Sequence, residues 1–306
     1  MDSILKTGGS SIVMGEKFFS GTFGKHSGKV LKISNITTQN DETKYVDIIS
    51  TIDNFNYYYI IPNDLAIVIK PTSDFYNFIK GVVNQDELNI FKGNLYGYFV
   101  DYGGNKDLLD TFNDIEQNPT ESIWSSYNDI LVFAKHIIEG ISFLNSKEIA
   151  HLDIKPENIM VNCKSGWIKN FRKSKHYFKI IDFGFASKYP FDDYVSHTRG
   201  TPGYLPRNLK IHGNTPFLPK IVANDFKLMY NRNFPLLTHR EFVYKIDSFC
   251  FGRVLYFLRY LYENNRIITC FDWSKKSKTK LDILINELIE PNVYNRRLPS
   301  ECLELF

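Results

Sequence analysis

The sequence has few of the features that mark secreted, zinc-binding or membrane-spanning proteins. Its 306 residues include only four cysteines, and none lies in a CxxC or Cys/His spacing that would hold zinc. Four scattered cysteines fit a reduced compartment better than a disulfide framework. No apolar run reaches the roughly 18 residues that a spanning helix needs, and the first residues lack the basic and apolar regions of a secretory signal. We therefore expect an intracellular, cytoplasmic protein without a transmembrane segment.

An excess of charge of one sign is also missing. The formal net charge is only +3, which gives no reason to expect direct binding to nucleic acid. Hydrophobic residues make up 43% of the chain and charged residues 23%, a balance that predicts a globular protein. There is no internal repeat, so the length predicts one large domain or two lobes. The sequence carries no indication of an oligomeric state.

The apolar pattern changes at a glycine turn over residues 103–105. Before this turn the chain is strand-rich, with one short helix expected over 42–52. The strands are expected over 30–36, 65–70 and 96–102. After the turn, apolar residues recur at helical spacing over 130–144, 246–262 and 280–289. The pattern predicts a small β-rich lobe with one main helix, followed by a larger α-rich lobe.

The strongest chemical signal is HLDIKPEN at residues 151–158, followed by Asp-Phe-Gly at 182–184 after a hydrophobic strand. Phosphoryl transfer requires positioning and charge neutralisation more than covalent chemistry. It needs a carboxylate at the acceptor hydroxyl and a lysine near the migrating phosphoryl group. It also needs oxygen ligands for Mg²⁺, a hard cation. The side chains that supply these groups are Asp153, Lys155, Asn158 and Asp182.

These motifs resemble the catalytic loop and the metal loop of the eukaryotic-type protein kinase superfamily. The resemblance implies an α+β, bilobal protein kinase fold, with residues 1–103 as the N-lobe and 104–306 as the C-lobe of one catalytic domain. It implies ATP and Mg²⁺ as cofactors, with Asn158 and Asp182 as metal ligands. Asp153 would accept the hydroxyl proton, and Lys155 would contact the γ-phosphate. A lysine two residues after the catalytic aspartate, as Lys155 is here, resembles the Ser/Thr class of these kinases. The implied partner is therefore a protein substrate with a Ser or Thr acceptor.

The small lobe contains a strand, Val30-Leu31-Lys32-Ile33, that resembles the family's phosphate-binding lysine strand. Lys32 would pair the α- and β-phosphates and a helix glutamate, for which Glu42 is the candidate. The alternative is that Lys32 is an ordinary lysine on the strand surface. Lys29, Asp41 and Asp47 lie nearby and are the other candidates for the two roles assigned to Lys32 and Glu42.

A glycine-rich stretch at residues 7–13 resembles the family's phosphate-covering loop, although Lys6 and Ser11 replace two of its glycines. Small residues let backbone N–H groups approach phosphates. The residues expected to cover the nucleotide are Gly8, Gly9, Ser10, Ser11 and Val13. A second candidate at 21–24 lies too close to Lys32 to be this loop. The alternative is that both stretches are ordinary glycine turns.

The stretch at residues 100–104 resembles the hinge between kinase lobes. Backbone groups of Asp101 and Gly103 would bind the adenine edge, Val100 would be the gatekeeper, and Asp107 would reach the ribose.

Further motifs lie in the second half of the chain. Gly-Thr-Pro-Gly-Tyr at 200–204 resembles a substrate-docking segment in which Thr201 bridges Asp153 and Lys155. Asp247 resembles a buried aspartate that ties down the catalytic loop.

The sequence departs from the family pattern at several places. Leu152 replaces the arginine that receives an activation-segment phosphate, so we expect activity without such phosphorylation, although Ser196 and Thr198 are available. The Ala-Pro-Glu motif is absent after Leu205, so Arg297 lacks its usual glutamate partner. The insert expected at 162–177 is either a solvated loop or a contact for an acidic or phosphorylated substrate. The insert expected at 208–243 is either a structural elaboration or a docking site for a substrate or a partner.

Such inserts and a short C-lobe resemble kinases of large DNA viruses, in which case the location would be the host cytoplasm. The irregular glycine loop leaves open a pseudokinase that serves as a nucleotide- or partner-binding scaffold. A small-molecule kinase is disfavoured by the docking segment around Thr201.

Overall fold

The computed structural model divides the chain into two compact units, which are described one at a time. Unit 1 comprises residues 1–50, 60–103 and 182–184, and unit 2 comprises 51–59, 104–181 and 185–306. The structure describes residues 4–8, 11–15, 28–62, 67–69, 77, 80, 95–104, 106–118, 122–124, 126–163, 177–191, 200–201, 203–206, 239–265 and 279–306.

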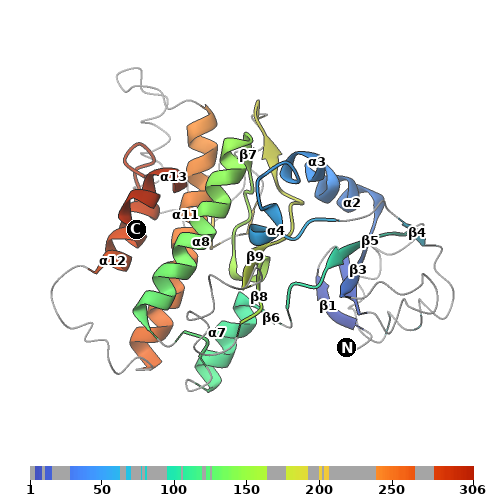
Figure 1. Cartoon of the computed structure of the whole chain (residues 1–306), viewed down its shortest axis with the longest axis horizontal. Coiled ribbons are helices and arrows are strands. Elements are labelled where there is room, and N and C mark those ends of the chain that lie inside the picture. Colours follow the sequence, from blue (N-terminus) through green and yellow to red (C-terminus); the bar gives the residue numbers. More distant parts are fainter. Residues whose placement is uncertain are drawn as a thin grey trace, which may run out of the picture. The chain divides into compact units, whose positions relative to one another are not determined.

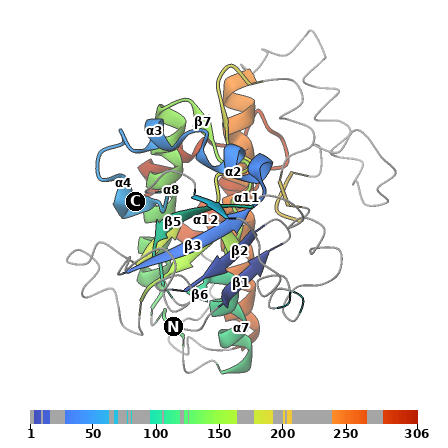
Figure 2. The same ribbon diagram turned by 90° about the vertical axis from the view of Figure 1, so that its right-hand side faces the viewer.

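Unit 1 is built on an antiparallel sheet with the strand order β1-β2-β3-β5-β4. The strands are β1 (Ile4–Gly8), β2 (Ser11–Met14), β3 (Lys29–Ser34), β4 (Ile67–Ile69) and β5 (Leu95–Asp101). Figure 2 shows β1, β2 and β3 side by side. Apolar strand residues such as Ile12, Leu31, Ile33 and Phe99 are buried, which gives the sheet its core. The strands expected near 30–36, 65–70 and 96–102 therefore exist.

The helical part of unit 1 differs from the expectation. The sequence predicts one helix over 42–52, but the structure has α2 (Ile36–Thr43) and α3 (Val46–Ile49), separated by a turn at Lys44 and Tyr45. The expected strand also ends early, because Ser34 and Asn35 stop it and Ile36 begins α2. As a result, Glu42 lies in the last turn of α2 and not at the start of a helix.

Unit 2 is mainly helical (Figure 1). Its helices are α4 (Phe55–Tyr58), α7 (Leu108–Gln117), α8 (Tyr127–Ser146), α11 (His239–Asn265), α12 (Lys280–Leu288) and α13 (Pro299–Cys302), with 3-10 turns η2 (Pro156–Asn158) and η5 (Leu303–Leu305). Capping boxes start α8 at Ser126 and α12 at Thr279. The three helices expected from apolar spacing are confirmed, since α8 and α11 cover their ranges and α12 ends one residue before the expected end at 289.

The core of unit 2 lies where α8 packs on short strands and on α11. The buried residues of α8 are Ile130, Phe133, Ala134, Ile137, Ile138, Ile141 and Leu144, the face that the sequence predicts. The strands are β6 (Lys106–Asp107), β8 (Ile159–Val161) and β9 (Phe178–Ile180) in one sheet, and β7 (Ile149–Ala150) with β10 (Ser187–Lys188) in another. The Phe133 ring lies 4.6 Å from Phe178 and 5.9 Å from Phe251 on α11. This core holds the segments that precede and follow the catalytic motif.

Much of the expected inserts lies outside the described residues, namely 164–176 and 207–238. Because α11 begins at His239, the end of the insert expected at 208–243 is helical, which corrects that boundary. Within the described ranges, no helix combines the length and apolar character that crossing a membrane requires.

Candidate active site

The chain after β7 is fixed by a buried aspartate on α11. Asp247 accepts hydrogen bonds from the backbone N–H groups of His151, at 2.8 Å, and Leu152, at 2.7 Å. Leu152 is buried and has a positive φ of 65°, a conformation that these two bonds help to hold. Burial raises the pKa of Asp247 to about 7, against the effect of both hydrogen bonds. Asp247 therefore has the structural role that the sequence predicts.

The four catalytic candidates of unit 2 meet around the carboxylate of Asp153. The Thr201 hydroxyl donates to Asp153 Oδ1 at 2.6 Å. The Lys155 ammonium lies 3.0 Å from Asp153 Oδ2 and donates to Thr201 Oγ1 at 2.7 Å. Asn158 Nδ2 donates to Asp153 Oδ2 at 3.0 Å and to the Asp153 carbonyl at 2.9 Å. Both carboxylate oxygens of Asp153 are thus held in place by charged or polar donors.

The orientation of Asn158 bears on its suitability as a metal ligand. Both of its hydrogen bonds to Asp153 use the amide nitrogen. The amide oxygen Oδ1 is then the atom that would face a cation, and oxygen is the donor that Mg²⁺ prefers. Asn158 is therefore chemically suited to the metal role expected of it.

Unit 1 holds a separate cluster of three charged side chains. The Lys32 ammonium on β3 lies 2.7 Å from Glu42 Oε1 on α2 and 3.9 Å from Asp182 Oδ1. Among the candidates, the structure thus pairs Lys32 with Glu42 and not with Asp41 or Asp47. Burial lowers the pKa of Lys32, but Asp182 and Glu42 raise it more, so the lysine stays charged. Burial raises the pKa of Glu42 to about 7, and Lys32 opposes this rise.

Asp182 has the geometry of a side chain held for coordination. Its φ is 66°, and its Oδ1 accepts a hydrogen bond from Gly184 N at 3.3 Å. The neighbouring Phe183 is buried, whereas 41% of the Asp182 side chain is exposed. A carboxylate that is turned outward beside a lysine suits a cation bound with phosphates, so Asp182 also fits Mg²⁺.

The expected phosphate-covering loop is described only in part. Gly8 ends β1 and pairs with Ser11, which begins β2, and Val13 lies opposite Lys32 in the sheet. Gly9 and Ser10 lie outside the described residues. Phosphate covering by this stretch stays a prediction.

The hinge candidates follow the last long strand of unit 1. Asp101 ends β5 opposite Lys29, and Gly103 follows it. Tyr102 N donates to Gly28 O at 2.9 Å, which ties this stretch to the start of β3. Adenine binding by the backbone at Asp101 and Gly103 stays a prediction.

Asp107 has a structural task that the sequence analysis missed. It is buried, and its Oδ1 accepts a hydrogen bond from Asp110 N at 2.8 Å, so it caps the start of α7 in unit 2. The signal was present as an Asp followed three residues later by another acidic residue. Contact with a ribose stays a prediction for this residue.

The arginine without its usual glutamate finds other partners. Arg297 Nε lies 3.2 Å from Glu287, and its guanidinium also lies 3.6 Å from Glu304. The adjacent Arg296 is the buried one, with its guanidinium 4.8 Å from the Phe249 ring and Nε donating to Glu290 O at 2.9 Å. Arg297 is therefore paired within the last helices, and nothing in the local sequence pattern singled out Arg296.

Known proteins resemble the part of the chain that carries these motifs. Residues 92–215 match the family model of the protein kinase domain, and this range includes 151–158, 182–184 and 200–204. The match covers less than half of the chain. Together with a β-rich unit and a larger helical unit, it decides the architecture. The chain has the α+β, bilobal protein kinase fold.

Individual kinases show the same partial likeness. Myosin light chain kinase 3 of Rattus norvegicus is 32% identical over 112 residues, which are 37% of this chain and 12% of that protein. Myosin light chain kinase 2, skeletal/cardiac muscle, of Homo sapiens is 33% identical over 107 residues, 35% of this chain and 15% of that protein. The chain thus matches only a small fraction of the length of these relatives, and the likeness supports a protein kinase.

Proposed function

We propose that this chain is an ATP-dependent Ser/Thr protein kinase, which transfers the γ-phosphoryl group of ATP to a protein hydroxyl. The observation that carries the proposal is the Asp153 carboxylate, held at once by Thr201, Lys155 and Asn158. A carboxylate fixed in this way can take the proton of an acceptor hydroxyl as the phosphoryl group arrives. The hydrogen bond that Lys155 donates to Thr201 supports the Ser/Thr class, since the resemblance associates a threonine that bridges Asp153 and Lys155 with that class.

The other charged side chains would neutralise the phosphates of ATP or hold the metal ion. Lys155, part-buried beside Asp153, offsets negative charge on the transferred group. In unit 1, Glu42 holds the Lys32 ammonium, which would neutralise the α- and β-phosphates. When bound, Mg²⁺ would polarise the γ-phosphoryl group, and Asp182 and the Asn158 amide oxygen are the side chains that would hold it. The stretch from Gly8 to Val13 would cover the phosphates, the Asp101 and Gly103 backbone would bind adenine, and Asp107 would reach the ribose.

The substrate class that we propose is a protein with a Ser or Thr acceptor in the cytoplasm. The likeness to myosin light chain kinases supports a protein substrate in general. A host-cell cytoplasm and a viral origin stay predictions from the inserts and the short C-lobe.

The function can be tested with the purified chain, Mg²⁺, labelled ATP and a panel of generic acidic and basic proteins. We expect labelled phosphoserine or phosphothreonine in at least one protein of the panel. Omission of Mg²⁺ should abolish the label, because the phosphate charge is then not neutralised. ATP binding without any transfer would contradict the proposal and favour the scaffold alternative.

A smaller prediction concerns phosphorylation of the chain itself. Leu152 is buried and apolar, so it offers no charge to a phosphate on Ser196 or Thr198. We expect phosphatase-treated protein, and the Ser196→Ala/Thr198→Ala variant, to keep kcat within about twofold of the untreated chain. Mass spectrometry would verify that phosphate is absent. A loss of activity that rephosphorylation at either site restores would refute this expectation.

A further inference from the structure

The last segment of unit 2 leaves a polar hollow beside the first turns of α11. The hollow has a volume of about 360 Å³, and its walls come from α11, from residues 294–297, from α13 and from η5. The charged side chains that line it are Lys245, Arg296, Arg297, Glu301 and Glu304. Three cations therefore share the hollow with two carboxylates.

These two kinds of charge differ in their exposure to solvent. Lys245 and Arg296 are buried, with 6% and 2% of their surface exposed. Glu301 and Glu304 are both exposed. The Glu304 carboxylate lies 3.6 Å from the Arg297 guanidinium, which it neutralises at the rim. Because solvent screens exposed charges more than buried ones, the buried part of the hollow stays positive.

The Lys245 ammonium has neutral hydrogen-bond partners. It donates to Val293 O at 3.1 Å and to Tyr294 O at 3.3 Å. Among the residues that the structure describes, no carboxylate forms an ion pair with it. An ammonium has three donors, so one N–H remains beyond these two bonds. A buried cation is costly without an opposite charge beside it, so Lys245 is a natural partner for an anion in the hollow.

Arg296 adds a second buried positive charge next to Lys245. Its NH1 donates to Lys245 O at 3.3 Å and its Nε donates to Glu290 O at 2.9 Å, and both acceptors are neutral carbonyl oxygens. Burial lowers the pKa of Lys245 more than the carboxylates of Glu301 and Glu241 raise it. The charge of Arg296 lowers that pKa further. An anion in the hollow would act in the opposite direction, because it favours the charged ammonium.

We propose that this hollow is a binding site for a phosphate-class oxyanion, which the side chains of Lys245, Arg296 and Arg297 would hold. Several acceptor oxygens on one small anion suit donors that converge from α11 and from the C-terminal segment, and charge-assisted hydrogen bonds of this kind are strong. None of these side chains belongs to the candidate active site. The inference is therefore independent of the proposed kinase function.

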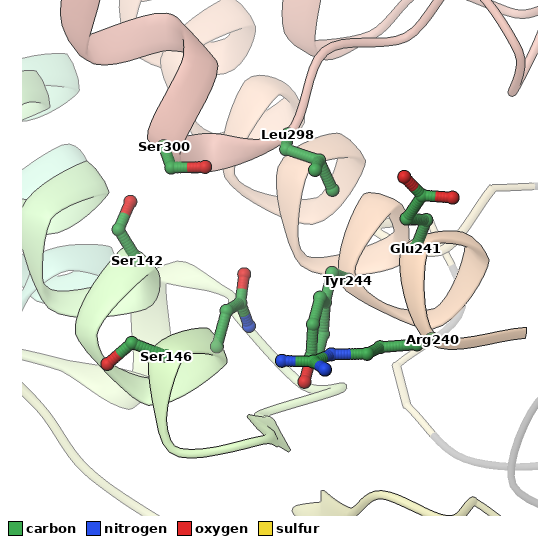
Figure 3. A pocket seen from close by; sticks show the side chains of 8 residues that line it. Ser142, Ser146, Arg240, Glu241, Tyr244, Leu298 and Ser300 are labelled. Carbon is green, nitrogen blue, oxygen red and sulfur yellow. The ribbon is translucent and has the colours of Figure 1, made fainter. Parts of the chain in front are cut away.

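A second hollow along α11 provides the contrast. It has a volume of about 280 Å³, and Figure 3 shows Arg240 and Tyr244 lying against each other in it. The Arg240 guanidinium also lies 5.9 Å from the Tyr189 ring centre, and its NH1 lies 3.5 Å from Glu148 Oε1. This cation already has a countercharge, and its side chain is 43% exposed. We therefore expect no anion site there, and Arg240 serves as the matched control.

The test is a calorimetric titration of the full chain with inorganic phosphate at constant ionic strength, repeated with chloride. We expect saturable binding of phosphate that chloride does not reproduce. Tm should rise with phosphate concentration, because a ligand that binds the folded state stabilises it. A parallel titration with O-phosphoserine distinguishes the source of the anion. Tighter binding of O-phosphoserine indicates an esterified phosphate, and tighter binding of inorganic phosphate indicates the free ion.

The deciding variant is Lys245→Met, which removes the ammonium and keeps an unbranched side chain. It should fold, because it takes away a buried charge that lacks an ion-pair partner. We expect phosphate to bind at least about tenfold more weakly, since a charge-assisted hydrogen bond is lost. Arg240→Gln should bind phosphate like the native chain. Native affinity in Lys245→Met would place the phosphate elsewhere in the chain and overturn the inference, as would binding that chloride reproduces.

A second variant keeps the test decisive if Lys245→Met does not fold. Arg297 is 37% exposed, so Arg297→Gln should leave the fold intact. It should weaken phosphate binding by about threefold, because a partly exposed cation contributes less than a buried one. Unchanged phosphate affinity in Arg297→Gln would then overturn the inference. Neither titration requires phosphoryl transfer, so an inactive chain would count against the proposed function and not against this site.

Discussion

Asp153→Asn should lower kcat by about 10³-fold, which is in the range that a general base contributes. The amide can still accept the Thr201 hydrogen bond, whose distance is 2.6 Å in the native chain, but it cannot take a proton. The loss should appear in kcat, while the dissociation constant for ATP changes less than about threefold. Stopped assays with labelled ATP and a separate ATP-binding titration measure the two quantities.

The matched control for this variant is Asp114→Asn. Asp114 is also an aspartate of unit 2, but it lies on α7 and pairs with Lys106 at the surface. Because exposed ion pairs contribute little, we expect its kcat to stay within about twofold of the native value. An Asp153→Asn variant that keeps more than about a tenth of native kcat would exclude Asp153 as the base.

Lys32→Met should have the second large effect, on activity and on stability together. The methionine leaves Glu42 and Asp182 without the ammonium that lies 2.7 Å and 3.9 Å from them. We expect kcat/KM for ATP to fall by at least about 100-fold, because no cation then meets the phosphates. We also expect the free energy of unfolding to fall by about 3 kcal/mol at alkaline pH, where Glu42 is ionised, since a broken buried pair then leaves an uncompensated carboxylate.

The stability loss should depend on pH in a defined direction. Burial already raises the pKa of Glu42 from 4.5 to about 7, and loss of Lys32 removes the main effect that opposes this rise. A carboxyl group with a raised folded-state pKa binds a proton more tightly in the folded protein. The native chain already carries the resulting stability penalty between pH 4.5 and about 7, so the extra loss caused by Lys32→Met is small below pH 7 and grows as pH rises above it.

Urea unfolding of Lys32→Met at several pH values would reveal this trend. The Lys32→Met/Glu42→Gln double variant should show much less of it, because the titrating group is gone. Lys29→Met changes a lysine on the same strand that makes no pair with Glu42, and it should keep native activity. If Lys32→Met unfolds with the same pH dependence as the native chain, the buried charge pair is not what stabilises unit 1.

The sequence predicts best those parts of the protein that are fixed by short-range chemistry. Asp153, Lys155 and Asn158 lie within one loop and one 3-10 turn, so their spacing alone brings them together. Helix α8 could be predicted with the same success, because a continuous apolar face requires burial whatever lies against it.

Long-range packing decides the features that the sequence did not reveal. The apolar spacing around Tyr45 is compatible with one helix or with two. The division into α2 and α3 therefore depends on tertiary packing and not on the local sequence. The same holds for Arg296 and Arg240, whose aromatic neighbours come from distant segments. A pattern of local residues cannot identify such partners.

The path of the chain through the two units has a consequence for how the protein can be divided. Residues 182–184 belong to unit 1 although their neighbours on both sides belong to unit 2. A fragment that ends at Gly103 would keep Lys32 and Glu42 but lack Asp182, and the complementary fragment would carry Asp182 without either of them. Neither piece is a self-sufficient module. Truncation or domain transplantation that cuts at the glycine turn would separate Lys32 and Glu42 from Asp182, so we expect the chain to be usable only when it is kept whole.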